Sequence, residues 1–548
     1  MLALLAGLLL ALSGCSDGND DGREGDSGAG REGGSITISQ TTQPDFLDPA
    51  LSYTLGGWEP MWLVYTPPLT YRHAEGEQGA ELIPGVAEAL PTISPDGKTY
   101  ELTLRKGLRY SDGTPAKASD VEHTIKRVLN LESGGSAFFL GIEGAEDYVD
   151  AGRADADIPG IETDDRTGEI TIKLTEPDGT FSNVLAMNFA GVVPGDTPFE
   201  NLTKSPPPGI GPYKITESVP NRQFVLERNR RFHIPGLPDG KLERITTRIV
   251  TSGTRAAQGV ISGELDYMQD PLPPDIKREI KAKYSDRYEE HPTSSTYYLF
   301  LNVRVPPFDQ EQVREAVSYG VDKPALARLF GGDLAPGCSF LPPGVPGYDR
   351  ALDVEDCPWG NPNEPPDVER ARRLIAEAGA EGANVTVWGD TLEPDDELAA
   401  AYAEMLNKIG LDAELKILDN AVYNQTIGNA RTEAQTGVTA WFQDFPHPKN
   451  FFFLVDGAAI QTTNNQNFGN VDDPEITAGI AELSGEPKLT PEVTDRWGEL
   501  NRQLVEEGWI VPFGHTTRPT FVSERMDFEN CTLFHPVYNN DYSSFCLK

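Results

Sequence analysis

Residues 439–446 combine three aromatic side chains with one carboxylate, a pattern suited to binding an ammonium group. Trp441, Phe442 and Phe445 supply large apolar faces, and Asp444 is an anion that only accepts hydrogen bonds at pH 7. A carboxylate removed from water needs a cation or several N–H donors, and an aromatic wall beside it suits an ammonium ligand. The alternative is structural, with Asp444 capping a turn and the aromatic rings filling a core.

No other segment has the set of residues that an enzyme needs. Residues 25–28 read G-D-S-G, as in serine proteases, but they lie in a polar stretch in which no oxyanion hole could be preorganised. Residues 97–99 read G-K-T, but Thr92 stands where a P-loop needs its first glycine. Residues 155–160 begin like a calcium loop, but Arg166 occupies the position of the bidentate glutamate. The seven His are scattered without metal-ligand spacing, so we expect no enzyme, no metal and no cofactor.

Length and composition predict a multi-domain protein that does not bind polyanions. The chain has 548 residues, of which 38% are hydrophobic, which is enough for several domains with folded cores. Its 85 acidic and 46 basic residues give a net charge of −39 at pH 7. This charge repels nucleic acids and anionic membrane surfaces, and it favours solubility outside or at the edge of a cell.

The N-terminus resembles the export signal of a bacterial lipoprotein. Residues 2–12 are apolar, too short for a membrane span of about 20 residues, and the segment ends in L-S-G-C at Cys15. This resembles a lipobox, which implies a signal peptide with lipobox over residues 1–15 and a lipid anchor on Cys15. Residues 16–34 contain no large apolar side chain and predict a flexible tether. No basic residue precedes the apolar run, unlike a typical signal peptide; the alternative is a buried helix.

The four other cysteines are Cys338, Cys357, Cys531 and Cys546. Four cysteines allow three pairings, and in an exported protein the local pairs, Cys338 with Cys357 and Cys531 with Cys546, are the simplest. Each local disulfide closes a short loop and contributes about 3 kcal/mol in the chain-entropy model. None of the four lies in a C-x-x-C motif, so we expect neither zinc binding nor redox chemistry.

Hydrophobic periodicity and turn residues predict both helices and strands. Residues 35–39 alternate as a strand, and residues 94–113 form two turns around another strand. A helix follows, for which Ser119 and Glu122 form a capping-box pattern. Farther on, helices and strands alternate, which indicates an α/β lobe. The elements predicted there are a helix from Asp367 to Gly379, a strand over 384–388, a helix over 398–409 and a strand over 411–418; another helix is predicted near 492–507.

Residues 84–131 contain three motifs in fixed order and spacing. They are Asp96-Gly97-Lys98-Thr99-Tyr100, Leu104-Arg105-Lys106-Gly107, and Ser111-Asp112-Gly113-Thr114-Pro115 with Ala118-Ser119-Asp120-Val121. In these motifs the chain resembles the bacterial extracellular solute-binding proteins of family 5, the peptide, nickel and oligosaccharide receptors of ABC importers. Residues 209–215 and 259–266 are also similar to segments of that family, and Gly263 is well placed to end a helix.

The resemblance implies an α/β fold of the two-lobe, type II periplasmic-binding-protein kind with a small inserted domain. It also implies an extracytoplasmic monomer, anchored to the cell membrane by lipid, that closes on its ligand and delivers it to ABC permease subunits without covalent chemistry. The implied division is lobe I from residues 35–70, 205–291 and 493–548, an inserted small domain from 71–204, and lobe II from 292–492.

The resemblance further implies a di- or oligopeptide as the ligand. In peptide-binding members a W-x-x-D segment places the Asp on the peptide's α-ammonium and the Trp against a side-chain pocket, which implies these roles for Asp444 and Trp441. Phe442 and Tyr297 are expected beside them. The sequence reads Asp444-Phe445-Pro446-His447-Pro448 where those members often have a second acidic residue, and we expect His447 to be a solvated loop side chain. The alternatives are an oligosaccharide or nickel chelate as ligand, or, in a different class, a secreted hydrolase or signalling receptor on the same fold.

Overall fold

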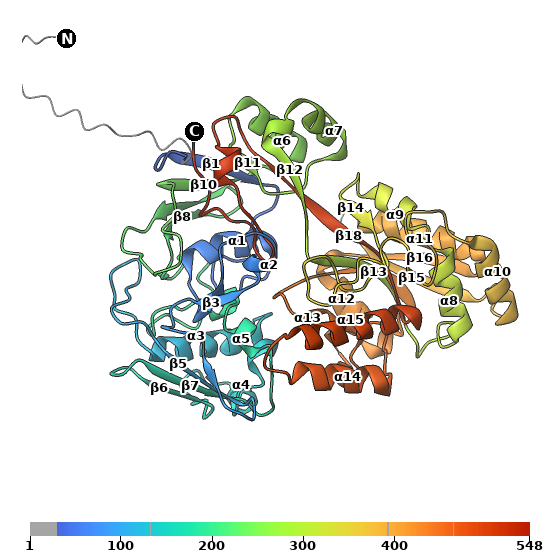
Figure 1. The fold of residues 1–548 in the computed structure, drawn as a ribbon, viewed down its shortest axis with the longest axis horizontal. Helices are drawn as coiled ribbons and strands as arrows, with labels where there is room; N and C mark the ends of the chain where they lie inside the picture. Colours follow the sequence, from blue (N-terminus) through green and yellow to red (C-terminus); the bar gives the residue numbers. More distant parts are fainter. Residues whose placement is uncertain (1–29, 132, 392–393, 464) are drawn as a thin grey trace, which may run out of the picture.

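The protein folds into two lobes, which lie side by side in Figure 1. The computed structural model describes residues 30–131, 133–391, 394–463 and 465–548. Lobe I carries a five-stranded and a four-stranded sheet, and lobe II carries a seven-stranded sheet. The predicted α/β class with two lobes is therefore confirmed.

Most of the predicted export signal and tether cannot be compared with the structure. Residues 1–15, including Cys15, and residues 16–29 lie outside the described residues. The remaining part of the predicted tether, 30–34, lies against lobe I, where the Arg31 amide donates to the Leu547 carbonyl at 2.8 Å. Within the described ranges, no helix has both the length and the apolar character needed to cross a bilayer.

The five-stranded sheet of lobe I starts from the first predicted strand. Its order is β11 (Tyr267–Met268), β1 (Ser35–Gln40), β10 (Arg244–Ile249), β9 (Gln223–Arg228) and β8 (Tyr213–Val219). The alternating sequence of β1 turns Ile36 and Ile38 to one side, where they join a buried cluster. The helices of this part are α1 (Leu55–Val64), α6 (Gly253–Ser262), α7 (Pro274–Lys283) and α16 (Phe528–Cys531). As predicted, α6 ends at Gly263, which has a φ of 79°.

The four-stranded sheet is covered by the helix that follows the second predicted turn. Its order is β4 (Thr92–Ile93), β5 (Thr99–Thr103), β7 (Glu169–Lys173) and β6 (Ile161–Asp164). Val121 and Ile125 of α3 (Ser119–Asn130) share a buried cluster with the inward side chains of β5 and β7. The predicted capping box is wrong, because Ala118 already has helical dihedrals and the Ser119 hydroxyl bonds to Asp165 at 3.1 Å instead. Nearby elements are α2 (Gly76–Gly79), α4 (Ala145–Ala151), α5 (Phe181–Val184), β2 (Leu69–Tyr71) and β3 (Leu82–Pro84).

The seven-stranded sheet of lobe II has a fully buried strand at its centre. Its order is β12 (Tyr288–Pro292), β18 (Ile510–Phe521), β13 (Ser295–Leu301), β17 (Thr436–Phe442), β15 (Asn384–Asp390) and β16 (Asp412–Leu418), with β14 (Leu334–Pro336) paired to β18. Every residue of β13 is buried, because Leu299 and Leu301 face one cluster while Tyr298 and Phe300 face another. Such a continuous apolar run is typical of a strand covered on both faces.

The helices of lobe II follow the predicted pattern. Asp367 caps α10 (Val368–Glu377) by accepting from the Arg370 amide at 2.9 Å, and Gly410 ends α11 (Asp395–Ile409) with a φ of 108°. Together with β15 and β16, these helices confirm the four elements predicted between 367 and 418. The other helices are α8 (Glu311–Gly320), α9 (Lys323–Leu329), α12 (Asn420–Ile427), α13 (Lys449–Phe452), α14 (Pro474–Ser484) and α15 (Pro491–Glu506).

A single strand, β18, belongs to both lobes, and Figure 1 shows it passing from one to the other. Its first half pairs with β13, and its second half pairs with β12, where Pro292 lies opposite Thr517. Buried Arg518 ties the second half to lobe I by donating to the Gln269 carbonyl at 2.6 Å and pairing with Glu59 at 3.4 Å. The chain therefore crosses between the lobes near residues 293–295 and within β18. The predicted residue limits of each lobe stay a prediction.

Both predicted disulfides are confirmed. Cys338 bonds to Cys357 in lobe II, and Cys531 bonds to Cys546 at the C-terminal end of lobe I. The second bond encloses the small hairpin of β19 (Phe534–His535) and β20 (Asn539–Asn540).

Candidate functional site

A cavity of about 1160 Å³ lies between the two lobes. Lobe I contributes three segments to its lining, within residues 53–58, 133–141 and 174–184. Lobe II contributes residues within 440–453 and 459–467, together with Asn424. Trp441, Phe442 and Asp444 all line this cavity, so the structure brings three of the four predicted ligand residues together.

The fourth, Tyr297, does not line the cavity. It is 8% exposed on the opposite face of β13, in the same cluster as Phe513. Its ring forms T-shaped pairs with those of Phe330 and Phe442, with ring centres 4.7 Å and 6.3 Å apart. Tyr297 therefore contacts Phe442 but does not itself line the cavity.

The end of β17 delivers the aromatic segment to the cavity. The β17 strand pairs with β13 as far as Phe442, opposite Ser295, and the Gln443 amide donates to the Ser294 carbonyl at 3.0 Å. Pro446 then interrupts the strand pattern, since proline has no amide hydrogen to donate. The chain turns into α13, leaving Asp444 in the short loop between the two elements.

Asn450 of α13 holds the loop in shape. Its side-chain carbonyl accepts hydrogen bonds from the Asp444 amide at 2.8 Å and from Trp441 Nε1 at 3.2 Å. Its side-chain amide donates to Asp444 Oδ2 at 2.8 Å. Asn450 thereby fixes the carboxylate and the indole relative to each other.

The Asp444 carboxylate is buried without a cationic partner. It is 6% exposed, and among the described residues it is met by two neutral donors, Asn450 and the Tyr53 hydroxyl from lobe I. Burial raises the pKa of this carboxyl to about 6, although both hydrogen bonds act in the opposite direction. A carboxylate in this state gains from a cation that enters the cavity, because the cation replaces lost hydration.

Replacing Asn450 with Ala should weaken the binding of an ammonium ligand about 5- to 30-fold, equivalent to about 1–2 kcal/mol for lost polar positioning. It should also raise the pKa of Asp444 above its present value, because a donor to the carboxylate disappears. Calorimetry measures the first effect, and NMR titration of the labelled carboxyl measures the second. Asn530→Ala, which removes an exposed amide bonded to Asp527, is the matched control. Unchanged affinity in Asn450→Ala would contradict this positioning role.

The same loop of lobe II contacts lobe I directly. Phe445 is 4% exposed and lies in the cluster of the four-stranded sheet, where its ring forms a T-shaped pair with that of Phe138, with ring centres 6.2 Å apart. Gln443 Nε2 donates to the Pro536 carbonyl of lobe I at 2.6 Å. Burial of Phe445 therefore depends on the lobes being together.

A second interlobe contact lies at the loop before α5. Lys449 of lobe II pairs with Asp178 of lobe I at 3.0 Å. The adjacent Gly179 amide donates to the Ser484 carbonyl of lobe II at 2.9 Å. These two contacts join the lobes at one side of the cavity.

The expectation of a solvated His447 is wrong. This side chain is 3% exposed, its Nδ1 accepts from the Lys449 amide at 3.1 Å, and its ring meets Trp497 at 5.9 Å. Burial lowers the pKa of His447 to about 3, so the ring is neutral at physiological pH. It supports the start of α13 and does not supply the second acidic group.

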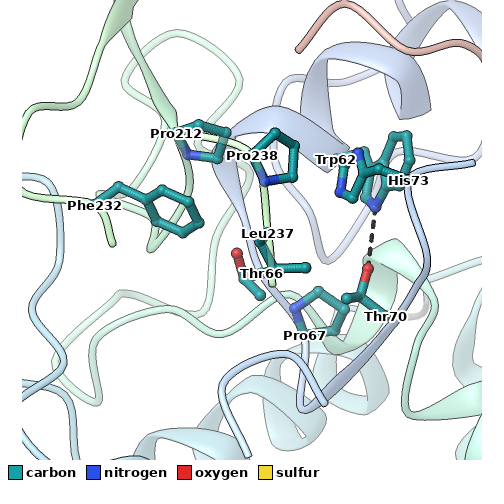
Figure 2. Close-up of a pocket in the computed structure, with 9 residues that line it drawn as sticks. All are labelled: Trp62, Thr66, Pro67, Thr70, His73, Pro212, Phe232, Leu237 and Pro238. Carbon is teal, nitrogen blue, oxygen red and sulfur yellow. Dashed lines mark hydrogen bonds between the residues drawn. The ribbon is translucent and has the colours of Figure 1, made fainter. Parts of the chain in front are cut away.

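Another pocket, shown in Figure 2, is too small for a solute. Its volume is about 10 Å³, room for about one water molecule. Trp62 donates to Thr70 Oγ1 at 3.2 Å on its wall and stacks on His73 with ring centres 4.3 Å apart. The interlobe cavity is therefore the candidate ligand site.

Two lobes that share a connecting strand and enclose a cavity between them define a ligand-binding protein of the periplasmic type II class. The chain belongs to the bacterial extracellular solute-binding proteins, family 5, whose middle-region family model matches residues 81–462. Members of this family are extracytoplasmic receptors that work with ABC permeases and are not enzymes, which confirms that expectation for the chain.

Several known proteins are similar over most of the chain. The dipeptide-binding protein DppE of Bacillus subtilis (strain 168) is 25% identical over 482 residues, which cover 85% of this chain and 84% of DppE. The dipeptide-binding protein of Escherichia coli (strain K12) is 28% identical over 421 residues, 72% of this chain and 74% of that protein. The solved structure of clavulanic acid biosynthesis oligopeptide binding protein 2 matches with a TM-score of 0.85 and 27% identity, covering 94% of this chain and 96% of that one.

Sequence reasoning did not identify four residues of the site: Tyr53, Asp178, Lys449 and Asn450. Asn450 and Lys449 follow the aromatic segment directly, and a polar pair at the start of a helix was a usable signal. Tyr53 and Asp178 lie in loops of lobe I, and only the fold brings them to Asp444 and Lys449.

Proposed function

We propose that this protein captures di- or oligopeptides in the interlobe cavity, with the peptide's α-ammonium on Asp444, and delivers them to an ABC permease. The observation that carries this proposal is the buried Asp444 carboxylate, which has neutral donors but no ion pair among the described residues. An ammonium group supplies both the missing charge and several N–H donors.

The cavity supports a peptide in other ways. Its volume of about 1160 Å³ is larger than the roughly 300–1000 Å³ typical of small-molecule sites, which leaves room for several residues. Trp441 and Phe442 offer flat apolar faces to the cavity, suited to a peptide side chain. Two relatives at 25% and 28% identity are named for dipeptides.

Neither family alternative fits the lining as well. A neutral oligosaccharide would leave the Asp444 charge without compensation, and no His or Cys occurs among the described residues that line the cavity to bind nickel.

Mass spectrometry of the native protein from its own host, looking for a co-purified ligand, tests the assignment. In calorimetry, N-acetylation of a bound peptide should abolish binding; equal binding of acetylated and free peptides would refute the Asp444 contact.

Peptide affinity should fall on the acid side of about pH 6. The folded-state pKa of Asp444 is about 6, so the carboxylate is charged above that pH and increasingly protonated below it. The peptide ammonium stays protonated throughout this range, since its pKa is about 7.7–8.0. Each pH unit below 6 should therefore cost up to about tenfold in affinity. Calorimetry from pH 7.5 to 4.5 measures this fall in affinity, and a constant affinity down to pH 5 would contradict the prediction.

We propose that the protein acts as a monomer, held to the cell membrane by a lipid on Cys15. The L-S-G-C sequence supports the anchor. Cys15→Ser should release the protein from the membrane fraction, and unchanged fractionation would exclude the anchor. Sedimentation of the released protein measures its oligomeric state.

A further inference from the structure

Four charged side chains occur among the described residues that line the cavity: Glu176, Asp178, Asp444 and Lys449. Lys449 is the one cation of this set. Whether the cavity tolerates an anionic group therefore depends on what Lys449 already binds.

Lys449 is held by Asp178. The ion pair spans 3.0 Å, and the two side chains are 32% and 29% exposed, so both are largely withdrawn from water. The same Asp178 oxygen accepts from the Thr180 amide at 2.9 Å and from its hydroxyl at 2.7 Å. Burial opposes ionisation, but Lys449 and Thr180 outweigh it and hold the pKa of Asp178 below its ordinary value. The pair is thus ionised, and its net charge is zero.

Glu176 does not alter this balance inside the cavity. Its side chain is 83% exposed and pairs with Lys98 at 3.2 Å, so water and a lysine neutralise it. The remaining charge is that of Asp444, which lies deep in the lining at 6% exposure. The described lining therefore presents one uncompensated negative charge.

We infer that the cavity selects ligands that bring one net positive charge into it: amines or short peptides whose carboxyl end is neutral, as an amide or ester, in preference to zwitterions. This inference rests on the proposed function. A free carboxylate inside the cavity would lose hydration, meet Asp444 and Asp178, and find Lys449 engaged. For Lys449 to bind that carboxylate, it would have to leave Asp178, whose carboxylate would stay charged and partly buried without its cation.

The experiment compares two mixtures of tri- to pentapeptides at pH 7.5, identical in sequence but ending in a free acid or an amide. Binding is measured by competitive native mass spectrometry and calorimetry for the wild type, Asp178→Asn and Glu162→Gln. Asp178→Asn releases Lys449 as a free cation while keeping the side-chain shape. Glu162→Gln is the matched control, because it breaks a carboxylate–lysine pair with Lys173 in the same sheet region, outside the cavity lining.

In the wild type and in Glu162→Gln, amides should bind about tenfold tighter than acids or more. In Asp178→Asn this preference should fall by about tenfold or reverse, since Lys449 is then available to the acid. Acids that bind the wild type as tightly as amides would overturn the inference, as would an unchanged preference in Asp178→Asn. If neither mixture binds, the proposed function fails, and the inference fails with it; if both bind and acids are preferred, only the inference fails.

Discussion

Asp444→Asn should weaken peptide binding by about 30- to 1000-fold, equivalent to about 2–4 kcal/mol, without lowering the melting temperature. The amide keeps the shape of the carboxylate and still offers an oxygen to Asn450, but it cannot neutralise the peptide's ammonium. Stability should be unchanged or slightly higher at pH 7. Because burial raises the folded-state pKa to about 6, ionisation of Asp444 costs folding free energy above that pH, and the substitution removes this cost.

Calorimetry and thermal unfolding of the same preparation measure the two effects. Asp456→Asn is the matched control, because Asp456 caps the short 3-10 helix Gly457–Ala459 by accepting from the Ala458 amide at 2.9 Å and is not among the lining residues. Wild-type affinity in Asp444→Asn would refute the ammonium contact. A large fall in melting temperature would instead indicate that Asp444 acts mainly as a structural acceptor.

Gly179→Ala should prevent the lobes from closing and reduce peptide affinity by about 100-fold, equivalent to about 2.7 kcal/mol. A Cβ on Gly179 would lie 2.0 Å from the Glu486 carbonyl oxygen and 3.2 Å from that of Ser484. Both obstacles are backbone atoms of lobe II, so neither can rotate away. The ligand favours the closed state only through contacts to both lobes, and these contacts are lost if the lobes stay apart.

Small-angle scattering with and without peptide measures closure. The wild type should become more compact when peptide is added, whereas Gly179→Ala should not. The melting temperature should change little, since the buried clusters of the five-stranded and seven-stranded sheets are separate. Gly485→Ala is the control on the other side of the contact, because its Cβ would meet nothing nearer than 3.5 Å. A Gly179→Ala variant that compacts normally would show that this contact does not limit closure.

The local elements of the fold could be predicted from the sequence where one signal dominated. Asp367 and Gly410 mark helix ends that the structure confirms, because a side-chain cap and a left-handed glycine act within a few residues. The predicted helix cap at Ser119 was wrong because a tertiary contact replaces it. Asp165, from the hairpin of the four-stranded sheet, bonds to both the amide and the hydroxyl of Ser119, and the helix begins without its own cap.

The site could be predicted only in part. The aromatic residues and Asp444 stand together in the chain, and their chemistry is visible there. Their partners in lobe I are not: Lys449 reaches Asp178 across a sequence separation of 271. His447 was expected to be a solvated loop side chain, but its ring meets the Trp497 ring from α15, a contact that no local pattern indicates.

The shared strand β18 has a consequence for how the two lobes can move. Because its first half is hydrogen-bonded to β13 and its second half to β12, the strand is held in both lobes, and we expect the lobes to move by twisting at the two crossings, near residues 293–295 and near Thr516 and Thr517. A small rotation there produces a large displacement at the far rim of the cavity, where Gly179 meets Ser484. Distance probes at that rim should therefore report opening with far greater sensitivity than probes placed beside the crossings.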